Sequence, residues 1–139
     1  MLVVDASVLV PLLVAEPNSA IARAVVAAEP ELLAPDLILA ETLNVLWKKQ
    51  RFGQIDDSLR IEAVGLVGPP LLVLVAMPPL ARRASALAYE LDHPVYDCFY
   101  LALAEREGAP LVTADARLVA KVAGTRHSGL VRQLGGSAP

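Results

Sequence analysis

The sequence has little cysteine, histidine or charge, and each shortage excludes a class of protein. Its 139 residues include one cysteine, Cys98, and two histidines, His93 and His127. A single cysteine excludes an internal disulfide and is typical of a reducing cytoplasm, and isolated histidines offer no spacing suited to zinc. Charged residues make up 19% of the chain and the net charge is −3, so no overall basic field gathers nucleic acid.

Long hydrophobic runs are also missing. The longest uncharged stretch contains 64–81, which is interrupted by glycines and prolines, and this leaves only the seven residues LLVLVAM at 71–77. A membrane-spanning helix needs about 20 apolar residues. Asp5 interrupts the region where the apolar core of a signal peptide would lie. We therefore expect a soluble cytoplasmic protein with no membrane partner.

Apolar residues in short runs are what the chain does have. Hydrophobic residues make up 55% of it and the mean hydropathy is +0.52. This length and composition predict one domain with a sizeable core, over 1–134, followed by a frayed tail at 135–139. So apolar a chain is also expected to cover further surface in a dimer or against a partner.

Short strand patterns alternate with longer helical ones along the chain. Strands are predicted at 2–4, 32–35, 71–77, 110–113 and, as an edge strand, within 129–134. Helices are predicted at about 7–15, 18–29, 36–50, from 56 to between 65 and 70, and at about 78–91, 95–107 and 116–124. This alternation is typical of an α/β fold, here a three-layer α/β/α domain with a mostly parallel sheet of 4–5 strands.

Several details of these elements are open to test. Ser7 and Asp36 are candidate N-caps of their helices. The run 71–77 is expected to be a strand covered on both faces. Leu39, Leu43, Leu46 and Trp47 share one helical stripe and are expected to face the core. His127 is expected at the surface or on an edge strand, and Cys98 in the core, because no motif places a general base beside it.

Acidic residues fall where parallel sheets bind ligands, outside the carboxyl ends of strands. Asp5 follows the first strand, and Thr113 and Asp115 follow the fourth. An isolated carboxylate among apolar residues costs several kcal/mol unless it is paired. Asp97 precedes the apolar segment CFYLALA, and Glu41 lies near the start of a helix.

Each acid also has an ordinary structural interpretation. Asp115 suits an N-cap, Glu41 a solvent-facing stripe with Asn44 and Lys48, and Asp97 a first-turn acid stabilised by the helix dipole. Carboxylates that converge, however, repel each other unless a cation neutralises them. A cluster of oxygen ligands selects Mg²⁺, or Mn²⁺, and such an ion supports phosphoryl chemistry with water as the nucleophile.

Four segments, in order, resemble the PIN-domain proteins and, more narrowly, the VapC toxins of toxin–antitoxin pairs. They are MLVVDASVLV, APDLILAETLNVLWK, HPVYDCFYLALAERE and LVTADARL, and together they span almost the whole chain. The resemblance implies an acidic metal site made of Asp5, Glu41, Asp97 and Asp115. Asp5 and Asp97 would bind the metal, Glu41 and Asp115 directly or through water, and Ser7 and Thr113 would be accessory hydroxyls.

The resemblance also implies an activity and partners. It implies a Mg²⁺-dependent endoribonuclease that cleaves RNA by water attack, and a homodimer inhibited by a cognate VapB-type antitoxin. The antitoxin's extended C-terminal part would cover an apolar groove. Alternatives within the family are an RNA-processing nuclease that is not a toxin, and a PIN domain that binds RNA or a partner without cutting.

A chain of net negative charge needs local basic residues to bind RNA. Lys48, on the same stripe as Glu41, is the best candidate, ahead of Lys49, Arg51, Arg82 and Arg83. Its alternative is a solvated or ion-paired side chain. Two other Mg²⁺-dependent classes fit poorly: a receiver module needs adjacent acids after its first strand, and a haloacid-dehalogenase phosphatase needs an acid where this chain has Ser7.

Overall fold

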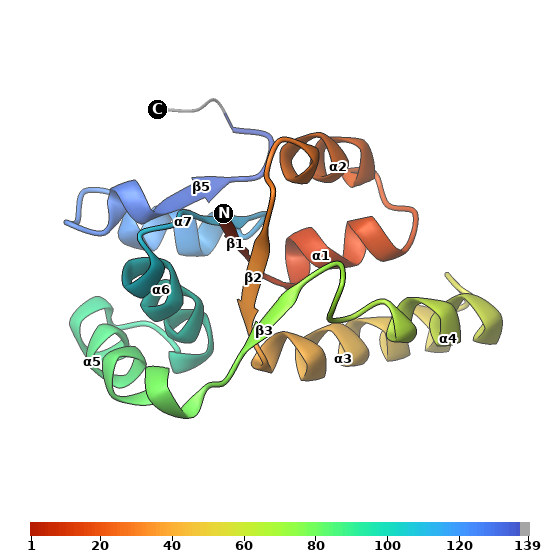
Figure 1. The fold of residues 1–139 in the computed structure, drawn as a ribbon, viewed down its shortest axis with the longest axis horizontal. Helices are drawn as coiled ribbons and strands as arrows, with labels where there is room; N and C mark the ends of the chain where they lie inside the picture. Colours follow the sequence, from red (N-terminus) through yellow and green to blue (C-terminus); the bar gives the residue numbers. More distant parts are fainter. Residues whose placement is uncertain (137–139) are drawn as a thin grey trace.

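The fold is a five-stranded parallel sheet with helices packed on both faces, seen in a computed structural model that describes residues 1–136 (Figure 1). The strands are β1 (Leu2–Val4), β2 (Leu32–Pro35), β3 (Val73–Val75), β4 (Leu111–Thr113) and β5 (Val131–Gln133). The α-helices are α1 (Ala6–Leu13), α2 (Ser19–Ala27), α3 (Leu37–Arg51), α4 (Asp57–Gly65), α5 (Ala81–Leu91), α6 (Val95–Glu107) and α7 (Ala116–Val122). Two 3₁₀ turns are η1 (Pro78–Leu80) and η2 (Ser128–Leu130).

The order of the strands places β1 in the middle of the sheet. The order is β3-β2-β1-β4-β5, and all four neighbouring pairs are parallel. Val3 of β1 pairs with Leu33 of β2 on one side and with Leu111 of β4 on the other. The chain therefore reverses its direction of travel across the sheet between β1 and β4, which makes their carboxyl ends the switch point where ligands bind in such sheets. The predicted three-layer parallel fold is confirmed.

The core lies between the sheet and helices α1, α5, α6 and α7. Cys98 and the run from Tyr100 to Ala104 are all buried on α6, as the apolar sequence there predicts. Burial of a large apolar side chain contributes roughly 1.5–3 kcal/mol relative to leaving it in water. Cys98 is fully buried, which confirms it as a core residue, and this burial raises the pKa of its thiol to about 11. Gly108, at a φ of 61°, ends α6 as its sequence predicts.

Two predictions about apolar exposure are wrong. The 71–77 run supplies only the three-residue strand β3, which lies at the sheet edge and is partly exposed, because β2 is its single neighbour in the sheet. On α3 the buried stripe is Ile38, Thr42 and Leu46, which are spaced four residues apart. The helix packs against α1 and α4. Of the predicted stripe only Leu46 is buried, while Leu39, Leu43 and Trp47 are exposed, Trp47 by 53%.

Three predicted caps and positions also change. Asp5, not Ser7, is the N-cap of α1, and α1 ends at Leu13 rather than near Ala15. Asp36 stands at the N-cap position of α3 but makes no capping hydrogen bond through its side chain. His127 is buried just before η2 rather than at the surface or on an edge strand, and its Nε2 lies 3.0 Å from Glu90 Oε1 of α5.

The described residues do not test every expectation about the ends of the chain. Residues 137–139 of the predicted tail lie outside the described residues, and the boundary at 134 stays a prediction. Over residues 1–136, no helix has both the length and the apolar character needed to cross a membrane.

Candidate active site

Asp5 lies at the carboxyl end of the central strand and is only 9% exposed. One of its carboxylate oxygens accepts from the Ser7 backbone N–H at 3.0 Å and from Ser7 Oγ at 2.5 Å. The Thr113 hydroxyl donates to the other oxygen. Burial is the largest influence on Asp5 and raises its pKa to about 6, although these hydrogen bonds oppose the change. Asp5 thus caps α1 and also projects a costly carboxylate at the switch point.

The two predicted accessory hydroxyls connect the first turn of α1 to the end of β4. Ser7 Oγ accepts from the Ala114 backbone N–H at 2.8 Å. Thr113 Oγ1 accepts from the Asp115 backbone N–H at 3.0 Å, and Thr113 is fully buried. The sequence predicted both hydroxyls near Asp5, and the structure brings both into contact with it.

Glu41 lies in the second turn of α3, and Tyr100 of α6 is its hydrogen-bond donor. Tyr100 Oη donates to Glu41 Oε1 at 2.5 Å, and Tyr100 is 1% exposed. Burial raises the pKa of Glu41, the Tyr100 hydrogen bond opposes this change, and the negative charge of Asp97 adds to it. Tyr100 escaped the sequence reading because it looks like one more core aromatic; its spacing of three residues from Asp97 was the available signal.

Asp97, in the first turn of α6, completes an electrostatic group of three carboxylates. Its charge raises the pKa of both Asp5 and Glu41. The charges of Glu41, Asp5 and Asp97 all raise the pKa of Tyr100 above its usual range, after burial. We call Asp5, Glu41 and Asp97 the acidic edge. The Asp97 side chain is 28% exposed, and its Oδ2 lies 2.6 Å from His93 Nε2, a contact that the sequence reading missed.

Asp115 joins the acidic edge through Thr113 rather than through its charge. It is the N-cap of α7 and accepts, on Oδ1, from the backbone N–H groups of Arg117 at 2.9 Å and Leu118 at 3.4 Å. Its charge is not among the influences on the pKa of Asp5 or Glu41. The structural role foreseen for Asp115 is therefore present, and its second oxygen accepts no hydrogen bond from residues 1–136.

Oxygen ligands that are free of protein donors remain at this site. Glu41 Oε2, Asp97 Oδ1 and Asp115 Oδ2 accept no hydrogen bond in the described part of the chain, while the partner oxygen of each does. Within that part, no three Asp, Glu, His or Cys side chains stand close enough together to form a finished metal site. Like charges that lack a cation repel, which favours this separation. The donor set fits a hard divalent cation that draws the carboxylates together.

Basic residues stay away from the acidic edge. No lysine or arginine in residues 1–136 forms an ion pair with Asp5, Glu41 or Asp97. The Lys48 side chain is exposed and has no protein partner in that range, so its ion-paired alternative is not seen. Lys49, in contrast, lies 2.5 Å from Glu16.

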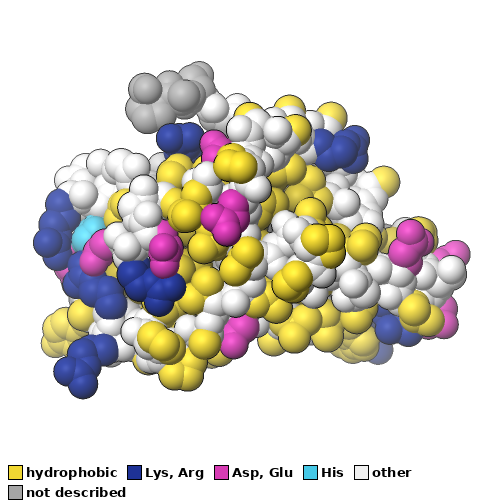
Figure 2. All heavy atoms as spheres, viewed as in Figure 1, with side chains coloured by type: hydrophobic (Ala, Val, Ile, Leu, Met, Phe, Trp, Pro, Cys, Tyr) yellow, Lys and Arg dark blue, Asp and Glu magenta, His cyan; other side chains and the backbone are white. Residues whose placement is uncertain are grey.

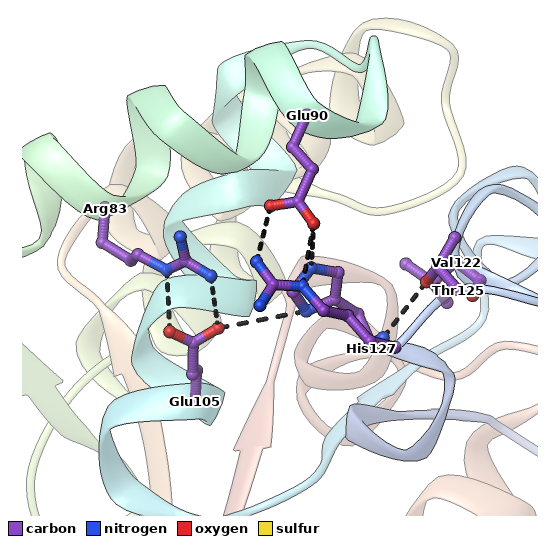
Figure 3. A network of polar contacts seen from close by, with 7 residues as sticks. Arg83, Glu90, Glu105, Val122, Thr125 and His127 are labelled. Atoms are coloured by element: carbon purple, nitrogen blue, oxygen red, sulfur yellow. Dashed lines mark hydrogen bonds and ion pairs between the residues drawn. The ribbon is translucent and has the colours of Figure 1, made fainter.

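A second polar cluster, away from the acidic edge, has carboxylates of the opposite character (Figure 3). Arg83 of α5 pairs with Glu105 of α6 through two hydrogen bonds at 2.7 and 2.9 Å. Arg126 pairs with Glu90 through two bonds at 3.0 Å, and His127 Nε2 lies 3.0 Å from Glu90 Oε1. We call these five residues the arginine network. In Figure 2, Lys and Arg side chains gather at the left, where α5 lies in Figure 1.

A parallel sheet covered by helices, with acidic residues at the carboxyl ends of its central strands, is the fold and site of a known protein family. The chain belongs to the PIN-domain family, whose sequence profile matches residues 2–124. The resemblance seen in the sequence is thereby confirmed for the family.

Individual relatives narrow the comparison. The chain is 35% identical over 125 residues to ribonuclease VapC3 of Pyrobaculum aerophilum, covering 86% of this chain and 93% of that protein. Its fold is similar to that of VapC20, a sarcin–ricin-loop-cleaving toxin of Mycobacterium tuberculosis, with a TM-score of 0.67, 16% identity and coverage of 91% and 98%. It is also similar to a toxin–antitoxin complex from Klebsiella pneumoniae, with a TM-score of 0.64, 18% identity and coverage of 95% and 96%. At these identities the two solved structures establish the fold alone.

Proposed function

We propose that this chain is the toxin of a type II toxin–antitoxin pair, a Mg²⁺-dependent endoribonuclease that hydrolyses RNA phosphodiester bonds by water attack. One observation carries the proposal: the charge of Asp97 raises the pKa of both Asp5 and Glu41, and the charges of all three carboxylates raise that of Tyr100. No lysine or arginine among residues 1–136 forms an ion pair with these carboxylates. The 35% identity to a ribonuclease supports the substrate class.

The residues of the chain have separate tasks in this proposal. Asp5 and Asp97 are the metal ligands, and Glu41 and Asp115 bind the metal directly or through water. Ser7 and Thr113 fix the Asp5 carboxylate, and Tyr100 fixes one oxygen of Glu41. A bound Mg²⁺ or Mn²⁺ lowers the pKa of water and offsets negative charge on the phosphate in the transition state. Lys48 binds RNA phosphates at the rim of the site.

The second partner in the proposal is a VapB-type antitoxin. Leu43, Trp47, Gln50, Arg51, Arg60 and Val64 line a groove of about 660 Å³ between α3 and α4. Leu43 and Trp47 of this groove are exposed, as is Leu39 elsewhere on α3. Figure 2 shows hydrophobic side chains along the lower part of the molecule, where α3 lies in Figure 1. Exposed apolar surface of this kind supports a partner. A homodimer and a cytoplasmic location complete the proposal.

Cleavage of a circular RNA tests the enzyme, because only an endonuclease opens a circle. Protein purified with Mg²⁺ should convert circular RNA to linear RNA, and EDTA should stop the reaction. The variant Asp97→Asn should lose the activity by about 100-fold or more while its unfolding temperature stays within a few degrees of the wild type. Equal cleavage by Asp97→Asn would sink the site assignment, and cleavage of linear RNA alone would favour an exonuclease.

Growth experiments separate the toxin from the two alternatives. Expression of the wild type should arrest growth, and the product of an adjacent small gene should relieve the arrest. An active nuclease that leaves growth unchanged would favour an RNA-processing enzyme. An inactive protein that still binds RNA would favour a PIN domain that does not cut.

A further inference from the structure

His93 lies in the short connection between α5 and α6, where hydrogen bonds hold both its backbone and its side chain. Asp92 ends α5 with a φ of 49°, and among residues 1–136 it alone has a positive φ without being a glycine. The Asp92 N–H bonds to the Tyr89 carbonyl at 3.4 Å and the His93 N–H to the Ala88 carbonyl at 3.1 Å. This pair of bonds is the Schellman motif that closes helix C-termini. The backbone of His93 is therefore held before its side chain makes any contact.

The His93 side chain then supplies a donor that the backbone cannot. Asp97 is the third residue of α6, the position from which an acidic side chain usually reaches back to the N–H of the N-cap residue. The N-cap of α6 is Pro94, which has no N–H, and no side-chain capping bond forms there. His93 Nε2, at 2.6 Å, takes the place of that donor. Because a carboxylate only accepts, the imidazole N–H donates.

The contact leaves half of the Asp97 carboxylate available. His93 binds Oδ2, and Oδ1 accepts no hydrogen bond from the described residues. The His93 side chain is 12% exposed and the Asp97 side chain 28%, so the ring is enclosed while the carboxylate reaches solvent. The Asp97 carboxylate therefore keeps one oxygen without a protein donor on a side chain that solvent and ions can reach.

We propose that His93 is a positioning residue, which holds the Asp97 carboxylate by one oxygen so that the other is presented to the divalent cation. This inference rests on the proposed function, because it takes the acidic edge as the metal site. His93 acts through Asp97 and does not touch the substrate. Groups that orient metal ligands in this way commonly change metal affinity by about 10- to 100-fold when they are removed.

Mn²⁺ binding to metal-stripped protein at pH 7, followed by calorimetry, tests the role without any cleavage assay. His93→Ala should raise the dissociation constant by about 10-fold or more. His93→Gln should recover most of the affinity, because the glutamine amide reaches about as far as Nε2. His93→Asn is shorter, should behave as the alanine variant does, and replaces it if that variant fails to fold.

The second histidine–carboxylate pair of the molecule provides a matched control. His127 also places Nε2 near a carboxylate, Glu90 Oε1, at 3.0 Å, but within the arginine network. His127→Gln should leave the Mn²⁺ affinity unchanged whatever it does to the unfolding temperature. If His127→Gln weakens Mn²⁺ binding as much as His93→Ala does, the effect is general instability and the proposal is wrong.

The remaining outcomes separate this proposal from the proposed function. Mn²⁺ binding by the wild type that Asp97→Asn abolishes and His93→Ala leaves intact would overturn the role of His93 alone. Equal weakening by His93→Ala and His93→Gln would show that the ring packs rather than donates, which also overturns it. A wild type that binds no Mn²⁺ would overturn both.

Discussion

The carboxylates of the acidic edge and those of the arginine network each have a histidine as a hydrogen-bond partner, but they have opposite properties. In the arginine network, hydrogen bonds from Arg126 and then His127 lower the pKa of Glu90 to about 2, and Arg83 lowers that of Glu105. At the acidic edge, burial raises the pKa of Asp5 to about 6 and also raises that of Glu41. The partners there are hydroxyl, phenol and imidazole groups rather than guanidinium groups.

The difference is whether the fold itself supplies a counter-charge to the carboxylate. A carboxylate with a bidentate arginine has its counter-charge within the fold, so it joins α5, α6 and the segment after α7. The carboxylates of the acidic edge are oriented by their hydrogen-bond donors, but no lysine or arginine among residues 1–136 supplies them with a counter-charge. The fold therefore holds the acidic edge in place at a cost in stability, which a cation from outside would offset.

The largest expected effect comes from removing one charge of the acidic edge. Glu41→Gln should lower RNA cleavage by about 100-fold or more, because a metal ligand is lost while the amide oxygen still accepts from Tyr100. The matched change in the arginine network, Glu90→Gln, should leave cleavage within about twofold of the wild type and lower the unfolding temperature. Initial rates on a labelled RNA and thermal unfolding measure the two effects. Loss of cleavage in both variants to the same degree would erase the comparison.

The next effect is a pH dependence of stability with opposite signs in the two regions. Asp5 has a folded pKa of about 6 against an ordinary value of 3.8. As the pH rises from 4 to 6 the unfolded chain releases its proton first, so the free energy of unfolding falls, by at most about 3 kcal/mol. Glu90, with a folded pKa of about 2 against 4.5, contributes stability above pH 4.5 that is lost as the pH falls toward 2.

Urea unfolding between pH 3 and 7, without divalent ions, measures this dependence. Asp5→Asn should reduce the fall between pH 4 and 6 to the part that Glu41 contributes, and leave the loss at acid pH. Glu90→Gln should do the reverse. The same pH profile for both variants and the wild type would mean that neither carboxylate titrates as its surroundings imply.

A smaller effect is expected from the buried histidine of the arginine network. His127→Ala removes a buried donor to Glu90 and should lower the free energy of unfolding by about 1–3 kcal/mol. RNA cleavage by the folded protein should stay within about twofold of the wild type, because His127 does not contact the acidic edge. Urea unfolding and initial rates test this pair of results, and a large loss of cleavage in fully folded protein would contradict it.

The smallest effect concerns the two neighbouring lysines of α3. Lys48→Ala should raise the KM for RNA a few-fold and lower the salt dependence of binding by about one counterion, with an unchanged unfolding temperature. Lys49→Ala, which breaks the ion pair with Glu16, should lower the unfolding temperature slightly and leave KM unchanged. An unchanged KM in Lys48→Ala would return Lys48 to the solvated side chain of its ordinary interpretation.

The sequence predicts the parallel sheet and the position of Asp5 because both depend on local patterns. A buried run such as LVV followed by an acid marks a strand end, and the alternation with helices implies parallel neighbours. The placement of LLVLVAM at the edge of the sheet does not follow from local pattern, because strand order is set by the whole chain. The periodicity of apolar residues on α3 predicted the wrong buried face. Leu39, Leu43 and Trp47 form an apolar stripe that is exposed, whereas the buried stripe runs through Ile38, Thr42 and Leu46.

The partners of the acids were harder to predict than the acids themselves. Tyr100 contacts Glu41 across 59 residues of sequence. Its spacing of three residues from Asp97 places it on the same side of the helix but does not identify Glu41 as its partner. His93 lies four residues before Asp97, but it precedes the helix rather than belonging to it. Their contact could be predicted only once Pro94 was known to be the N-cap of α6. His127 was misplaced for the same reason: its partners Glu90 and Glu105 come from other helices.

The most direct test of the account is the position of a divalent ion in the folded protein. Anomalous diffraction from a crystal loaded with Mn²⁺ locates the ion without assuming any activity. We expect a peak bonded to carboxylate oxygens of Asp5 and Asp97, close to Glu41, with Glu90 and Glu105 still paired to their arginines. A peak at the arginine network, or none at the acidic edge at saturating Mn²⁺, would contradict the account.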